Sequence, residues 1–158
     1  MAATSAALCL WRRGGVDGIE VLVVHPGGPY WANKDEGAWS LPKGEYDPAI
    51  ELGEHAARRE FAEETGTDAP EGPLVALGSS TLKSGKTIHA WAIEGDLDAT
   101  AISSNSFEIE WPPKSGTRQR FPEVDRALWC GPETARLKLN AAQAVFVERL
   151  TKPVTPAP

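Results

Sequence analysis

The chain has 158 residues, with 22 acidic and 16 basic side chains, so its formal net charge at pH 7 is −6. This negative balance excludes a general electrostatic attraction to nucleic acid or to anionic membranes, and we expect neither as a partner. The length suits one domain, which we place at residues 1–150, and the proline-rich residues 151–158 are predicted to form a disordered tail.

Apolar segments and cysteines indicate a cytoplasmic protein. No segment approaches the roughly 18 apolar residues of a membrane span. The apolar run at residues 6–11 is too short for the core of a signal peptide, and its arginines follow it. Cys9 and Cys130 lie in apolar, strand-like runs, which predicts buried, reduced thiols. The sequence leaves the choice between a monomer and a homodimer open.

The patterns along the chain predict strands and helices in mixed order. The β-branched run at 19–25 is typical of a strand, and Gly85 lies in a turn between two strand-like runs. Such an order suits an α/β (α+β) fold in which a sheet is sandwiched between helices. The strands are expected at 5–13, 19–25, 74–83, 87–93, 107–111 and 127–129, and the helices at 53–65, 133–139 and 141–150.

The helix predicted at 53–65 carries an unfavourable cluster of charge. Glu60, Glu63 and Glu64 are spaced to lie over one patch of the helix surface, where like charges repel. They lie in the last turn before Gly66, where the helix dipole is already negative. A divalent cation removes both penalties, and oxygen ligands suit Mg²⁺ or Mn²⁺. Ala57 and Phe61 form the core-facing stripe of the same helix.

Residues 44–67 resemble the Nudix box, the signature of the Nudix hydrolases. Gly44 opens the box, Glu51 is its middle glutamate, and the sequence from Arg59 to Gly66 matches its end. Six residues separate Gly44 from Glu51 where the family has five, which predicts a one-residue bulge before the helix. Thr67 stands where an apolar residue is usual. The resemblance implies the Nudix fold, a mixed β-sheet sandwiched between α-helices.

The same resemblance implies Mg-dependent hydrolysis of a phosphoanhydride bond in a nucleoside diphosphate linked to another moiety. The sequence Pro42-Lys43-Gly44 is similar to that of diadenosine polyphosphate hydrolases and of relatives that cleave nucleoside triphosphates. These substrates therefore lead, and ADP-ribose, dinucleotide cofactors and capped RNA ends follow. The alternative is a non-catalytic Nudix domain that senses a nucleotide. Such a domain is expected to lose glutamates of the box, whereas this chain retains all of them.

The resemblance also assigns roles within the box. Glu60, Glu63 and Glu64 are the implied metal ligands, and Glu60 is also the candidate to orient or deprotonate the attacking water. Arg59 and Glu51 are the implied support pair, in which the guanidinium holds a glutamate ligand and is itself braced by a carboxylate.

Further site residues are expected outside the helix. One more metal ligand comes from Glu108, Glu110 or Glu123. We choose Glu123, because the Phe121–Trp129 stretch resembles the corresponding segment of asymmetrical diadenosine tetraphosphate hydrolases.

The substrate is expected to meet Lys43 and Gly44, with Lys43 reaching a phosphate as a point charge. Trp39 is the aromatic chosen for substrate binding, although either Trp31 or Trp39 is able to stack on a base. His25 ends a strand near the presumed cleft, and a structural role is favoured for it over a substrate role.

Overall fold

The chain folds around a long central strand, β1 (Thr4–Arg13), in a computed structural model that describes residues 2–152. Strand β5 (Thr87–Glu94) pairs with β1 in parallel along one edge. The other edge of β1 is shared: β3 (Lys43–Tyr46) pairs with its first half and β2 (Ile19–Pro26) with its last residues, both antiparallel. Strands β2 and β3 therefore separate beside the middle of β1, and this separation positions the candidate site.

Two further strands complete the mixed, six-stranded sheet. Strand β4 (Val75–Thr81) pairs with β5, and β8 (Val124–Cys130) pairs with β2, both antiparallel. The order across the sheet is β4-β5-β1-β2-β8, with β3 attached to β1. This arrangement confirms the predicted mixed sheet.

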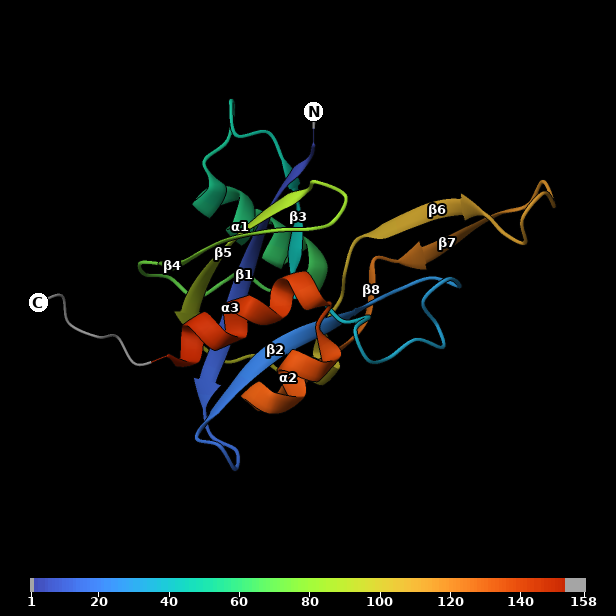
Figure 1. The fold of residues 1–158 in the computed structure, drawn as a ribbon. Coiled ribbons are helices and arrows are strands. Elements are labelled where there is room, and N and C mark those ends of the chain that lie inside the picture. The colour runs from blue at the N-terminus through green and yellow to red at the C-terminus, as the bar shows by residue number, and fades with distance from the viewer. Residues whose placement is uncertain (1, 153–158) are drawn as a thin grey trace, which may run out of the picture.

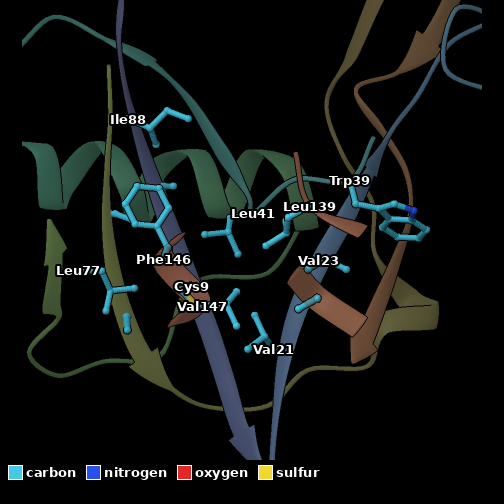
Figure 2. Packing of buried hydrophobic residues seen from close by; sticks show 14 of the residues in the cluster. Cys9, Val21, Val23, Trp39, Leu41, Leu77, Ile88, Leu139, Phe146 and Val147 are labelled. Atoms are coloured by element: carbon cyan, nitrogen blue, oxygen red, sulfur yellow. The ribbon is translucent and has the colours of Figure 1, made fainter. Parts of the chain in front are cut away.

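Helices cover both faces of the sheet, as predicted. Helix α1 (Gly53–Thr65) lies on one face, and α2 (Pro132–Lys138) and α3 (Ala141–Thr151) lie together on the other (Figure 1). Alternate residues of β1 feed the two apolar layers, because side chains along a strand point to opposite faces. Leu8 packs towards α1, whereas Cys9 packs towards α3, in the cluster drawn in Figure 2.

The two cysteines are buried, free thiols, as the sequence predicts. Burial raises the pKa of the Cys9 thiol to about 12 and that of Cys130 to about 11, so both stay protonated at neutral pH. No helix within residues 2–152 is long and apolar enough to cross a membrane.

A separate two-stranded ribbon is formed by β6 (Ser106–Glu110) and β7 (Arg118–Pro122), after a 3-10 turn, η1 (Ala99–Ala101). Figure 1 shows this ribbon projecting from the main sheet.

Several elements differ from the prediction. Strands β3 and β7 were not predicted, because Lys-Gly-Glu-Tyr is short and polar and β7 carries three polar residues in succession. Strand β8 begins three residues earlier than predicted, and Thr151 belongs to α3 and not to a tail. Lys152 caps the C-terminus of α3, and residues 153–158 of the predicted tail lie outside the described residues.

Candidate active site

Helix α1 carries its carboxylates to the gap between β2 and β3. Ala57 and Phe61 are fully buried against the sheet, so the adjacent face of the helix, which carries the glutamates, lies at the edge of the core. Gly66 ends the helix in the left-handed conformation, with φ of 76°, and its N–H donates to the Ala62 carbonyl at 2.8 Å. The predicted stripe and stop are therefore both present, and the glutamate cluster is held in the last two turns.

The Arg59 guanidinium joins three glutamates. Its Nε and Nη2 each donate to one carboxylate oxygen of Glu51 at 2.9 Å, which makes a bidentate pair. Its Nη1 donates to Glu60 Oε1 at 2.7 Å and lies 3.4 Å from both carboxylate oxygens of Glu63. Hydrogen bonding to Arg59 holds the pKa of Glu51 below its ordinary value. The Arg59 guanidinium thus positions the carboxylates of Glu60 and Glu63, and Glu51 positions the guanidinium.

Gly44 allows the Glu60 carboxylate to lie directly against the backbone of β3. A Cβ at position 44 would lie 2.0 Å from Glu60 Cδ, so no other residue fits without displacing that carboxylate. Gly44 lies in strand β3, paired with Ala6, and its missing side chain allows the close approach of Glu60. The chain turns after β3, where the N–H groups of Ile50 and Glu51 both donate to the Asp47 carbonyl.

Burial shifts the acidity of two cleft carboxylates. Glu60 is only 8% exposed, and burial raises its pKa above the ordinary value. Burial also raises the pKa of Glu64, to about 8, although the backbone N–H of Lys43 donates to its Oε1 at 3.0 Å. For both groups the negative charge of Glu123 adds to the effect of burial. Burial and the neighbouring carboxylates therefore outweigh the positive charge of Arg59 at Glu60 and that of Lys43 at Glu64.

Of the three glutamates considered outside the box, only Glu123 reaches this cleft. It lines the same cavity as Glu60, Glu63 and Glu64. Glu108 instead accepts a hydrogen bond from Arg118 Nε at 2.8 Å, and Glu110 accepts one from the Lys114 backbone N–H at 2.7 Å. Those two carboxylates lie on the other face of the ribbon from the residues that line the cleft.

The donor set suits a hard divalent cation. Glu60, Glu63, Glu64 and Glu123 supply only oxygen atoms, which Mg²⁺ and Mn²⁺ prefer, and partial or full burial raises the pKa of Glu60 and Glu64. Among residues 2–152, no three acidic, histidine or cysteine side chains already converge on one point as a metal cage. Instead, the Arg59 guanidinium binds the Glu60 carboxylate and the Lys43 N–H binds the Glu64 carboxylate.

Metal affinity is expected to fall as the pH is lowered from about 8 to about 6. Between its ordinary pKa of 4.5 and its folded value of about 8, Glu64 holds a proton that a cation must displace. The raised pKa also affects the stability of the metal-free protein. Protonated Glu64 contributes most to folding stability below pH 4.5, and this contribution is lost as the pH rises through about 8. Calorimetric titration with Mn²⁺ should give up to about tenfold weaker binding per pH unit. Equal affinity at both pH values would contradict this expectation, and Glu64→Gln should flatten the dependence.

Aromatic and apolar side chains also line the cleft. It has a volume of about 500 Å³, and its lining includes Tyr30, Trp31, Phe107 and Ile109 as well as Lys43 and the carboxylates. Sequence reasoning considered Trp31 but missed the other three aromatic and apolar residues. The signal was available in the ribbon, where the order Phe-Glu-Ile-Glu places two apolar side chains on one face.

Trp39 does not line this cleft, which corrects its expected role in substrate binding. Its side chain is only 4% exposed, and its indole N–H donates to Asp35 Oδ1 at 2.7 Å. The ring packs edge-on against His25 with centroids 5.0 Å apart. A ring enclosed in this way has no free face for a base, and Trp31, which is 41% exposed, is the tryptophan that faces the cleft.

His25 has the structural role that the sequence favours. The ring is fully buried, with Nδ1 2.8 Å from Asp125 Oδ1 and Nε2 2.8 Å from the Lys34 carbonyl oxygen. It links the end of β2 to the loop that carries the cleft aromatics and to the strand that follows Glu123.

The segment entering β3 is fixed from the other face of the sheet. Gln143 of α3 is fully buried, and its Oε1 accepts the Leu41 N–H at 2.7 Å. Figure 2 shows Leu41 near Phe146 and Leu139 in the apolar layer that α3 covers. The position of Lys43 at the cleft therefore depends on packing on the far side of the sheet.

Comparison with known proteins agrees with this geometry. The family model of the NUDIX domain matches residues 2–150. An Ap4A hydrolase from C. elegans has a TM-score of 0.64 and 18% identity, covering 93% of this chain and 95% of its own. The NUDIX domain of Shewanella oneidensis NrtR, solved with ADP ribose, has a TM-score of 0.63 and 16% identity, covering 98% and 90%.

A third solved structure, the MutT protein from Methanosarcina mazei Go1, has a TM-score of 0.58 and 20% identity over 94% of this chain and 91% of its own. At these identities the likeness shows the fold, and the family model adds the family. With the complete box on α1 and β3, the chain belongs to the Nudix hydrolase family.

Proposed function

We propose that this enzyme is a Mg²⁺-dependent hydrolase of a phosphoanhydride bond in a nucleoside triphosphate or a diadenosine polyphosphate. The supporting observation is that Glu60, Glu63, Glu64 and Glu123 line one cleft with Lys43 beside them. A cleft this acidic repels a polyphosphate unless a cation is bound, and it offers that cation only oxygen ligands.

These four carboxylates are the residues that would hold Mg²⁺ or Mn²⁺. When bound, such an ion lowers the pKa of a water molecule and neutralises charge on phosphate oxygens. Glu60 is the candidate general base: its raised pKa suits proton acceptance, and the Arg59 contact at 2.7 Å fixes one carboxylate oxygen. The water oxygen would attack one phosphorus, its proton would pass to Glu60, and the bridging P–O bond would break as the other phosphate group leaves.

Arg59 and Glu51 act in this proposal as positioning residues. The bidentate pair fixes the guanidinium, so Nη1 is directed at Glu60 and Glu63. The Glu63 side chain is 36% exposed and that of Glu60 is 11% exposed, so Glu63 is the more open of the two carboxylates of the helix patch that Arg59 contacts. The arrangement keeps like-charged groups close together before any ligand enters.

Two criteria favour particular substrates. They should resemble the ligands of the relatives, and their phosphate chain should extend beyond the proposed metal site. One solved relative is an Ap4A hydrolase and another was solved with ADP ribose. A chain of three or more phosphates extends past the carboxylates towards Lys43, whereas the two phosphates of ADP-ribose leave less charge there. Lys43 therefore supports the longer polyphosphates.

The experiment incubates the full chain with Mg²⁺ and each of five nucleotide classes: nucleoside triphosphates, diadenosine tetraphosphate, ADP-ribose, a dinucleotide cofactor and capped RNA. Anion-exchange chromatography resolves the products. Conversion of a triphosphate or the tetraphosphate to a nucleoside monophosphate or diphosphate supports the proposal. Tight binding of nucleotides without cleavage of any of them would favour the alternative, a nucleotide-sensing Nudix domain.

Replacing Lys43 with alanine should lower kcat/KM for diadenosine tetraphosphate or a nucleoside triphosphate by roughly tenfold, about 1.4 kcal/mol. The substitution removes the positive head from the cleft but leaves the backbone N–H that binds Glu64. Its effect on ADP-ribose, if ADP-ribose is cleaved, should be smaller. Steady-state kinetics on both substrates tests this, and an equal loss on both, or none on either, means that Lys43 does not contact the polyphosphate.

A further inference from the structure

The ribbon of β6 and β7 has an apolar face formed by side chains of both strands. Within the described residues its two strands pair only with each other. Phe107 and Phe121 are directly paired, with ring centroids 6.1 Å apart, and Ile109 follows on the same face. All three are only half-buried. A two-stranded ribbon is marginally stable alone, so this face requires a partner.

The loop after β2 supplies part of that partner. The Gly27 N–H donates to the Glu123 carbonyl at 2.9 Å, which fixes the loop to the end of β7. Gly28 lies under the Phe107 ring, because a Cβ there would be 2.8 Å from Phe107 Cζ. Tyr30 then contacts Trp111 edge-on, with centroids 5.3 Å apart and planes at 78°. The loop and the ribbon therefore form one continuous surface.

This surface remains open towards the cleft. Tyr30 is 60% exposed and Trp31 is 41% exposed, which is high for large aromatic side chains. Together with Phe107 and Ile109 they line the cavity that the carboxylates also line. The outer face of the ribbon differs completely, since it carries charged pairs such as Glu108 with Arg118 at 2.8 Å. The apolar character is thus confined to the side that faces the candidate active site.

We propose that Tyr30, Trp31, Phe107 and Ile109, here called the base wall, bind the nucleobase of the substrate by stacking. This inference rests on the proposed function. It concerns the nucleobase, the part of the substrate that the cleft carboxylates do not bind. A ligand that joins an anionic phosphate chain to a flat aromatic ring matches both sides of the cleft. The volume of about 500 Å³ lies in the range of ~300–1,000 Å³ typical of small-molecule sites.

The composition of the base wall also predicts its selectivity. Its contacts are apolar or aromatic, and stacking depends on the area of the base more than on its hydrogen-bonding edge. We therefore expect adenine and guanine nucleotides to bind with similar affinity and pyrimidine nucleotides to bind more weakly.

Calorimetric titration of the full chain with AMP and with ribose 5-phosphate, in the same Mg²⁺ buffer, tests this inference. The two probes share a sugar and a phosphate and differ in the base. Wild-type protein should bind AMP at least about tenfold more tightly. Phe107→Ala and Tyr30→Ala should each weaken AMP binding by about five- to a hundredfold and leave ribose 5-phosphate unchanged, given ~1–3 kcal/mol per stacked base.

Arg120→Ala is the matched control, because Arg120 lies on the outer face of the same ribbon. Thermal melting checks each variant. If Phe107→Ala melts early, Tyr30→Ala decides, since the Tyr30 side chain is largely exposed. Wild-type protein that binds AMP no more tightly than ribose 5-phosphate overturns the inference, as does an equal loss in Arg120→Ala. Neither probe has a phosphoanhydride bond, so the result is independent of whether hydrolysis is observed.

Discussion

Glu64→Gln is expected to lower turnover at least about a hundredfold while the fold is retained, a loss of at least ~2.7 kcal/mol of transition-state stabilisation. Glutamine keeps the volume of the side chain and an oxygen that accepts the Lys43 N–H, but it removes the negative charge. Glu63→Gln should behave in the same way, because Glu63 lines the same cleft. Steady-state kinetics with saturating Mg²⁺ measures the effect.

Glu54→Gln provides the matched control for these variants. Glu54 lies in the first turn of α1 and is exposed, so its loss changes the charge of the helix but not of the cleft. Its turnover should equal that of the wild type. Near-normal activity in both Glu63→Gln and Glu64→Gln would refute the assignment of these residues as metal ligands, and equal losses in all three variants would point to helix stability as the cause.

Gly44→Ala is expected to reduce turnover by about a hundredfold, because it displaces Glu60. The new Cβ would lie 2.0 Å from Glu60 Cδ, and β3 has little freedom to retreat while Gly44 is paired with Ala6. Misplacing a reacting or ligating group by about 1 Å can cost 10²-fold in rate. Kinetics and thermal melting together measure the effect, with activity lost more than stability.

Gly131→Ala is the corresponding control. A Cβ at Gly131 would meet only the flexible side chain of Asp17, at 2.8 Å from its Oδ2, and the position caps α2 away from the cleft. This variant should keep wild-type turnover. If Gly44→Ala also kept it, the carboxylate of Glu60 would not need its place against β3, and the role given to this glycine would be wrong.

The parts of the site that depend on local sequence could be predicted, and α1 is the example. The spacing of Ala57 and Phe61, the glutamate cluster and the Gly66 stop are all properties of one helix, and the structure has each of them. The general fold could be predicted from the order of the elements and from the resemblance of the box.

The parts that depend on contacts between distant segments could not be predicted in the same way. Nothing local shows that Gly44 faces Glu60, because that contact requires β3 to pair with β1. Glu108 and Glu123 could not be separated until the pairing of β6 with β7 placed Glu108 on the outer face. The role of Trp39 was wrongly predicted for a similar reason: its ring packs against His25 of β2, which is distant in the sequence.

The central claim is that the carboxylate cluster on α1, with Glu123, holds a divalent cation that hydrolysis requires. The most direct test is the rate of diadenosine tetraphosphate hydrolysis as Mg²⁺ is titrated into chelator-treated protein, for the wild type and for Glu64→Gln. We expect no turnover without the cation, saturable activation of the wild type, and at least about a hundredfold lower maximum in the variant. Cleavage at the same rate in excess chelator, or equal activation of both proteins, would contradict the claim.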